Sequence, residues 1–171
     1  MIKKIQNNFN NSSTTSFKAK IANEEQIMRY MEILKKESVS PSVFFPEYFD
    51  KLKTLKGDDF FKYYAKMTEK KAKLCSKIEK KLNTKLEEIK KFADDTFSVK
   101  IGRLVEDPNT TVLTVFNEKH PDYKDAAMTF YATPKTPVKN SSELALLNCV
   151  LDVDVTKLEK AKNNIFKLNN C

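Results

Sequence analysis

The chain has little glycine, histidine or cysteine and no tryptophan: its 171 residues include 2 glycines, 1 histidine and 3 cysteines. A phosphate-binding loop or a dinucleotide-binding fold needs several glycines clustered at a strand-to-helix turn, because only a residue without Cβ lets backbone amides approach phosphate closely. Gly57 and Gly102 lie far apart in the chain. The sequence therefore excludes these nucleotide-binding folds.

The cysteines and the histidine also restrict the chemistry. Cys75, Cys149 and Cys171 are odd in number and form no C-x-x-C pair, so neither a disulfide framework nor a zinc knuckle is indicated. This usage favours a reducing compartment, and we expect a cytoplasmic protein. A single histidine, His120, leaves tetrahedral Cys/His metal sites and acyl-transfer triads without an obvious partner. We expect no cofactor and no metal.

Long apolar segments are missing as well. No run of 18 or more apolar residues occurs, so the sequence predicts no membrane span. The start Met1-Ile2-Lys3-Lys4 resembles a secretory n-region, but asparagines and Ser12 stand where an apolar h-region would follow. Residues 1–15 are rich in Asn, Ser and Thr and read as a flexible tail. With 40% apolar residues, residues 16–171 can bury the core of a single soluble domain.

Helical periodicity is the strongest pattern that is present. Apolar spacing and capping signals predict five helices, the first opened by a capping box of Asn23 and Gln26. Gly57 is expected to end the second helix, and Asp58 to cap the third. In the third, Asn83 could end a helix and Thr84 could cap a new one, so two helices joined near residue 83 remain an alternative to one. The predicted helices span about 23–36, 47–55, 59–92, 142–151 and 154–168.

Strand patterns lie between these helices. Phe97–Ile101 alternates apolar and polar residues, Thr111–Phe116 is rich in β-branched residues, and Asp107-Pro108-Asn109 is typical of the turn of an antiparallel hairpin. Ala127–Ala132 is expected to be a third strand, and the alternation from Phe17 to Ile21 suggests a fourth. The predicted fold class is α+β: an antiparallel sheet of three to four strands packed against amphipathic helices, with the long helix covering the sheet.

The positive charge is concentrated in one part of the chain. The net charge is +8, and residues 51–91 alone carry 14 basic and 6 acidic side chains. At 100° per residue, lysines of the long helix fall in one stripe opposite its apolar side. This stripe is a candidate polyanion site, although a merely solvated helix face explains it equally simply. Its candidate binding residues are Lys62, Lys66, Lys70, Lys73, Lys77 and Lys81, with Lys80 beside them.

Other candidates for chemistry are weak. His120 could act as a base near Asp122 and Asp125, but no nucleophile accompanies it, and a polar loop explains it better. Asp152, Asp154 and Glu159 are candidate ligands of a cation, but a helix-capping role explains Asp154 better. Cys75 lies beside the apolar stripe and is expected to be buried. No catalytic residue is assigned, and we expect the chain not to be an enzyme.

Three functional hypotheses follow. The first is a non-catalytic interaction module with a protein partner, favoured because no catalytic or cofactor motif occurs. The alternative is nonspecific binding of nucleic acid or another polyanion through the lysine-rich helix 59–92. The third is an enzyme whose site is assembled from residues distant in sequence. The sequence predicts neither the identity of a partner nor the oligomeric state.

Overall fold

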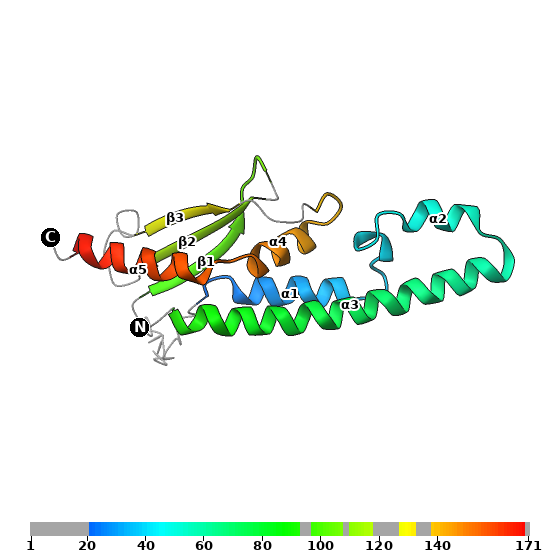
Figure 1. Ribbon diagram of the computed structural model, residues 1–171, viewed down its shortest axis with the longest axis horizontal. Helices are drawn as coiled ribbons and strands as arrows, with labels where there is room; N and C mark the ends of the chain where they lie inside the picture. The colour runs from blue at the N-terminus through cyan, green and yellow to red at the C-terminus, as the bar shows by residue number, and fades with distance from the viewer. Residues whose placement is uncertain (1–20, 93–96, 108–109, 118–126, 133–137, 170–171) are drawn as a thin grey trace, which may run out of the picture.

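The computed structural model of the chain describes residues 21–92, 97–107, 110–117, 127–132 and 138–169. The predicted tail 1–15 and the loop with His120 lie outside these residues. The described elements, in chain order, are shown in Figure 1: α1 (Glu24–Lys35), η1 (Pro41–Val43), α2 (Tyr48–Thr54), α3 (Gly57–Phe92), β1 (Phe97–Arg103), β2 (Thr111–Asn117), β3 (Ala127–Ala132), α4 (Ser142–Leu151) and α5 (Val155–Asn169).

Helices dominate the structure, and this corrects the predicted fold class. The helix α3 alone has 36 residues, whereas the strands have 7, 7 and 6. The chain is thus mostly helical, not a domain centred on a sheet of three to four strands. The antiparallel strands follow the order β1-β2-β3, but the core side chains described in the sheet come from the β1–β2 pair. Residues 17–20 of the predicted fourth strand lie outside the described residues, and its last residue, Ile21, makes one parallel bridge to Val99.

The long helix is continuous, which decides between the two alternatives for residues 59–92. At Thr84 the hydroxyl donates to the carbonyl of Lys80 inside the helix, at 3.0 Å, and therefore does not cap a new one. Leu82, Leu86 and Ile89 are buried on the same side of α3 across the suspected break. Continuous packing of this apolar stripe outweighs the local capping signal.

The second helix ends earlier than predicted. Leu55 is the C-cap of α2, whereas Gly57, with φ of 55°, begins α3. This positive φ suits glycine, because a side chain would strain the backbone there. Gly57 therefore forms the corner at which the chain reverses from α2 into α3 (Figure 1).

The segment before α1 protects the outer edge of β1. The amide of Ala22 donates to the carbonyl of Val99 at 2.8 Å. The side chain of Asn23 donates to the carbonyl of Ile101 at 2.5 Å and accepts from its amide at 3.1 Å. Asn23 makes no side-chain cap of α1, so the predicted capping box is wrong. Its amide group instead pairs with the strand edge as a neighbouring peptide would.

Replacement of Asn23 by alanine is therefore expected to lower the free energy of unfolding by about 1–3 kcal/mol, because the amide and the carbonyl of Ile101 both lose their partner. Urea denaturation followed by far-ultraviolet circular dichroism would measure this. The exposed Asn163→Ala on α5 is the matched control, expected to change stability by less than about 0.5 kcal/mol. Equal stability of the two variants would contradict the role given to Asn23.

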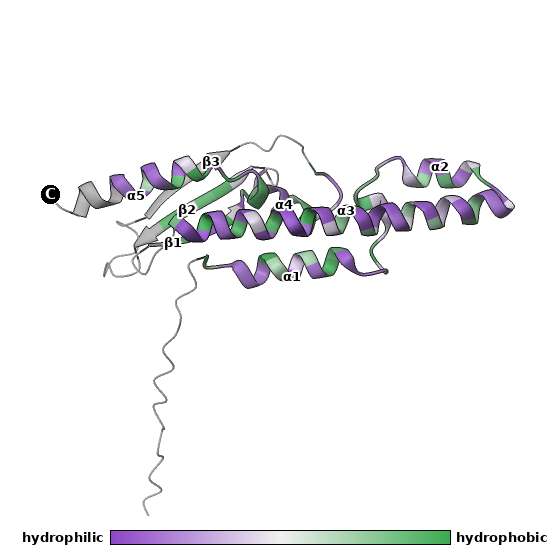
Figure 2. Cartoon of the chain, turned by 60° about the horizontal axis from the view of Figure 1, so that its bottom comes forward, coloured by the Kyte–Doolittle hydropathy of each residue, from purple (hydrophilic) through white to green (hydrophobic). Residues whose placement is uncertain are grey.

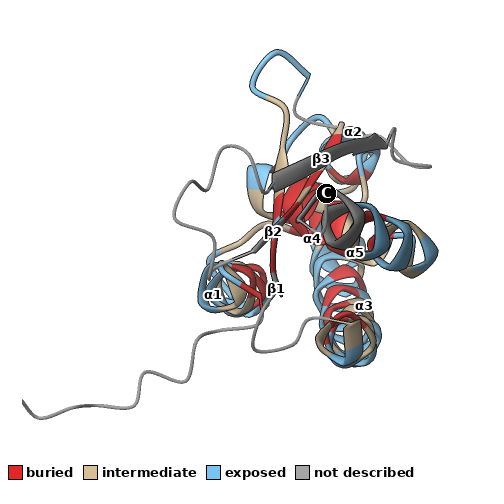
Figure 3. Ribbon diagram, turned by 90° about the vertical axis from the view of Figure 1, so that its left-hand side faces the viewer, coloured by how far each residue is buried: buried red, intermediate tan, exposed pale blue. Residues whose placement is uncertain are grey.

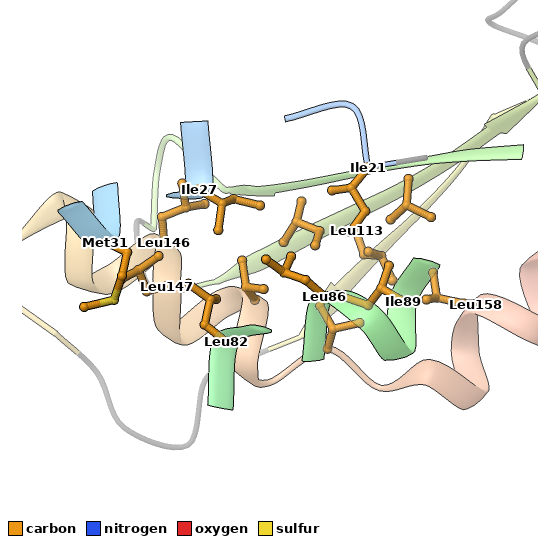
Figure 4. Close-up of a cluster of buried hydrophobic side chains, with 14 of the residues drawn as sticks. Ile21, Ile27, Met31, Leu82, Leu86, Ile89, Leu113, Leu146, Leu147 and Leu158 are labelled. Carbon is orange, nitrogen blue, oxygen red and sulfur yellow. The ribbon is translucent and has the colours of Figure 1, made fainter. Parts of the chain in front are cut away.

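The helix α4 lies at the centre of the molecule. Ser141 caps it, its hydroxyl accepting from the amide of Leu144 at 3.1 Å. Most of its side chains are buried, because it contacts α1, α3, β1 and β2. Figure 4 shows its Leu146 and Leu147 among core side chains of α1 and α3. The following helix, α5, begins after Asp154, whose carboxylate accepts from the amide of Thr156 at 3.0 Å. This confirms the expected capping role of Asp154.

One face of the sheet is covered, but not mainly by the long helix. Val99, Ile101, Leu113 and Val115 are buried, while Lys100 between the first two is exposed, as alternation in a half-covered sheet requires. The helices α4 and α5 make the principal contacts with the sheet, whereas α3 packs against α1, α4 and α5. Figure 3 shows the buried sides of these helices turned toward one another. The expectation that the long helix covers the sheet is therefore wrong.

Candidate functional site

The six lysines predicted as a polyanion site are all exposed on α3. Between Lys62 and Lys81, successive members of the set are separated by three or four residues. The set extends over about 28 Å of helix at 1.5 Å per residue. The opposite side of the helix is buried through Met67, Cys75 and Leu82. We call this set the lysine face; it consists of Lys62, Lys66, Lys70, Lys73, Lys77 and Lys81.

One member of the lysine face has an acidic neighbour. The Lys73 ammonium lies 2.6 Å from a carboxylate oxygen of Glu69, one helical turn away. This hydrogen bond and the charge of Lys73 lower the pKa of the Glu69 carboxyl. Both side chains are well exposed, so the pair contributes little to stability. Purple segments recur with green ones along α3 in Figure 2, as an amphipathic helix requires.

Lys71 stands inside the apolar stripe, where the sequence showed only an interruption. Its side chain is buried, and its ammonium donates to the carbonyls of Lys36 at 2.6 Å and Val39 at 2.5 Å. These carbonyls follow the C-terminus of α1, where the helix dipole favours a cation, and the carbonyl of Lys36 also accepts from the amide of Val39 at 3.1 Å. Burial lowers the pKa of Lys71. Lys71 is thus a structural residue that fixes the end of α1 on α3.

The position of Lys71 also marks where the body of the molecule ends. Cys75 contacts the carbonyl of Leu34, and Lys35 pairs with Glu79 at 3.1 Å, so the C-terminal end of α1 lies beside residues 71–79 of α3. The earlier part of α3 extends beyond α1 and is accompanied by α2 (Figure 1). We call residues 48–68, which comprise α2 and the first turns of α3, the arm.

Aromatic side chains gather on the arm. Tyr48 packs against Phe49 and stacks on Tyr63, with ring centroids 5.2 and 6.0 Å apart. Phe49, Phe61 and Tyr64 nevertheless remain 49%, 69% and 50% exposed. We call these three side chains the aromatic end. Sequence reasoning placed the aromatic residues of α3 on or beside the core face, but beyond α1 there is no body to cover them.

The lysine face and the aromatic end are different surfaces. Phe61 and Lys66 are five residues apart, which places them about 140° apart around the helix axis. The surroundings of the aromatic end carry both signs of charge, because Asp50, Asp58 and Asp59 are exposed near it together with lysines of α2. A base-stacking platform with lysines around it, as single-stranded nucleic acid would need, is not formed by these described residues.

The remaining predicted candidates bring no catalytic group together within the described residues. His120, Asp122 and Asp125 lie outside them, as does Cys171. Cys75 is buried as expected, and so is Cys149; burial raises the pKa of both thiols. Within the described part of the chain, no group of three His, Cys, Asp or Glu side chains could hold a metal ion.

Comparisons with known proteins add no assignment. No protein-family model, curated protein or solved structure matches this chain. Among the helices that the structure describes, none combines the length and the apolar composition needed to cross a membrane.

Proposed function

We propose that this protein is a non-catalytic interaction module that binds a protein partner through the aromatic end of the arm. The observation that carries the proposal is the exposure of Phe49, Phe61 and Tyr64 on a helical hairpin that extends beyond the body. Aromatic residues are enriched in protein interfaces, and Phe61 and Tyr64, three residues apart, lie on the same side of α3. A cytoplasmic location, suggested by the cysteine usage, belongs to the same proposal.

The charges around the aromatic end support a protein partner over a polyanion. Asp50, Asp58 and Asp59 would repel phosphate groups, whereas a polar rim with both signs of charge is usual for a protein interface. The rigid rings also lose little conformational entropy on binding. The partner is expected to present an apolar pocket with a mixed polar rim.

The test compares two variants of the full chain. Phe61→Ser combined with Tyr64→Ser removes two rings from the aromatic end, whereas Lys66→Glu, Lys73→Glu and Lys77→Glu together reverse the lysine face. A partner found by proximity labelling is purified, and its affinity is measured with each variant. We expect the serine variant to weaken binding at least about tenfold, since anchors at interfaces commonly contribute about 2 kcal/mol. Partners that bind the serine variant as tightly as the wild type would refute the proposal.

A second function, nonspecific polyanion binding, is favoured by the continuous exposed lysine face. Binding of labelled single-stranded and duplex DNA and RNA would be measured over a salt series with the triple glutamate variant. Lys53→Glu, Lys100→Glu and Lys160→Glu form the matched control, because these exposed lysines lie off the stripe and give the same change in charge. If the lysine face binds phosphates, affinity falls steeply with salt and is lost in the first triple variant but retained in the control. Equal loss in both would indicate a response to net charge alone.

A further inference from the structure

Two cavities follow one another between α3 and α4. One, of about 460 Å³, has mainly apolar walls that include Val43, Phe44, Leu74, Ile78 and Leu144. The other, of about 560 Å³, is lined mainly by charged and polar residues together with Leu151. Asn148 of α4 lines both cavities. Each volume lies within the range of small-molecule sites, about 300–1,000 Å³.

Helical geometry places the two cavities in line along α3 and α4, and we call the pair the groove. Leu74, Ile78, Lys81 and Lys85 lie at spacings of four, three and four residues, so they fall on one side of α3. Leu144, Asn148 and Asp152 are similarly spaced on α4 and its C-cap. Both helices run in the same direction past each other (Figure 1). Along the groove the lining therefore changes from mainly apolar residues to mainly charged and polar ones, with Asn148 shared by both halves.

The polar half carries more positive than negative groups. Three lysines line it, Lys80, Lys81 and Lys85, against the two carboxylates of Glu88 and Asp152. The Lys85 ammonium is held by the carbonyl of Val153 at 3.1 Å and lies 3.6 Å from Glu88. Lys80 and Lys81 are exposed. These two side chains can approach an anionic group at the end of the groove.

We propose that this groove binds a single-chain anionic amphiphile, with the apolar chain against Leu74 and Ile78 and the carboxylate or phosphate head at Lys80 and Lys81. An alkyl chain in the groove would remove the half-buried apolar walls from contact with water, which favours binding. The anionic head would accept charge-assisted hydrogen bonds from the ammonium groups of Lys80 and Lys81, and these are stronger than the hydrogen bonds that a neutral head accepts. This site is separate from the aromatic end, so the two proposals can fail independently.

The experiment is calorimetric titration of the full chain with dodecanoate and with dodecyl phosphate, below their micelle-forming concentrations. Inorganic phosphate and non-ionic dodecyl maltoside are the comparison probes. Both anionic amphiphiles are expected to bind saturably and at least about tenfold more tightly than either comparison probe, because binding needs both chain and charge. A preference between the two amphiphiles identifies the head group. Amide shifts in NMR spectra should concentrate at Ile78, Lys81 and Asn148.

The variants separate the two halves of the groove. Lys80→Gln with Lys81→Gln should weaken dodecanoate about tenfold, while the matched Lys62→Gln with Lys66→Gln, outside the groove on the same helix, should leave it unchanged. Because all four lysines are exposed, both variants should fold, and their NMR spectra verify this. The proposal is overturned by absence of saturable binding, by equal binding of dodecyl maltoside or of phosphate alone, or by equal affinities of the two lysine variants.

Discussion

Replacement of Leu147 by alanine is expected to lower the free energy of unfolding by about 2–5 kcal/mol. Leu147 is fully buried at the middle of α4, and Figure 4 shows it near Leu82 of α3 and Leu146 of its own helix. Because α4 contacts α1, α3 and both core strands, a cavity there weakens several interfaces at once. Urea denaturation monitored by circular dichroism would give the change.

The matched control for Leu147 is Phe61→Ala, which removes a larger side chain that is 69% exposed. This change should alter stability by less than about 0.5 kcal/mol. The pair therefore separates the body, where apolar side chains hold the fold, from the arm, where Phe61 is available for a partner. A loss at Phe61 as large as that at Leu147 would mean that the aromatic end is part of the core.

Lys71→Glu is expected to destabilise the protein by about 3–5 kcal/mol, because it replaces the buried donor with a carboxylate that faces two carbonyl oxygens, which are themselves acceptors. The ammonium of Lys71 donates to the carbonyls of Lys36 and Val39, and a carboxylate can donate to neither. The adjacent Lys70→Glu makes the same change in charge on the exposed side of α3, with an expected effect below about 0.5 kcal/mol. Thermal and urea unfolding of both variants would measure the contrast; equal effects would show that only the charge change matters.

The stability contribution of Lys71 should depend on pH with a definite sign. Burial lowers the pKa of the folded-state ammonium below its unfolded value of about 10.4. The folded protein therefore releases this proton first, and stability rises with pH between the lowered pKa and the unfolded one. Lys71→Met has no such group. The difference in unfolding free energy, wild type minus Lys71→Met, should increase from neutral pH up to about the unfolded-state pKa. A difference that does not change with pH would contradict the lowered pKa of Lys71.

The helices could be predicted from local sequence because their signals are local. Apolar residues at three- and four-residue spacing located α3, and Ser142–Leu151 was predicted with the observed bounds. The lysine face was found by the same projection, since opposite sides of a helix are fixed by its pitch alone. Capping was less reliable: Asp154 was predicted correctly, but the side chain of Asn23 binds Ile101, which lies far away in the sequence.

The balance between helix and sheet could not be predicted in this way. Alternation between Phe97 and Ile101 shows that a segment can be a strand, but it does not reveal how much core the strands supply. That depends on α4, whose nearly continuous apolar sequence lets it pack against helices on one side and strands on the other. The predicted α+β domain gave the sheet a larger role than it has.

The sequence by itself determined the amphipathic helices, the lysine stripe and the absence of a glycine-rich nucleotide-binding loop, because periodicity and composition set these. Only the tertiary structure decided that Lys71 is buried, that Phe61 is exposed, and that Ile78 of α3 and Asn148 of α4 line the same cavity. The reason is that burial depends on what lies opposite a residue, and local sequence does not contain that information. Lys71 of α3 lies beside the end of α1. On one side of this point α3 is covered by α1, and on the other side it projects as part of the arm.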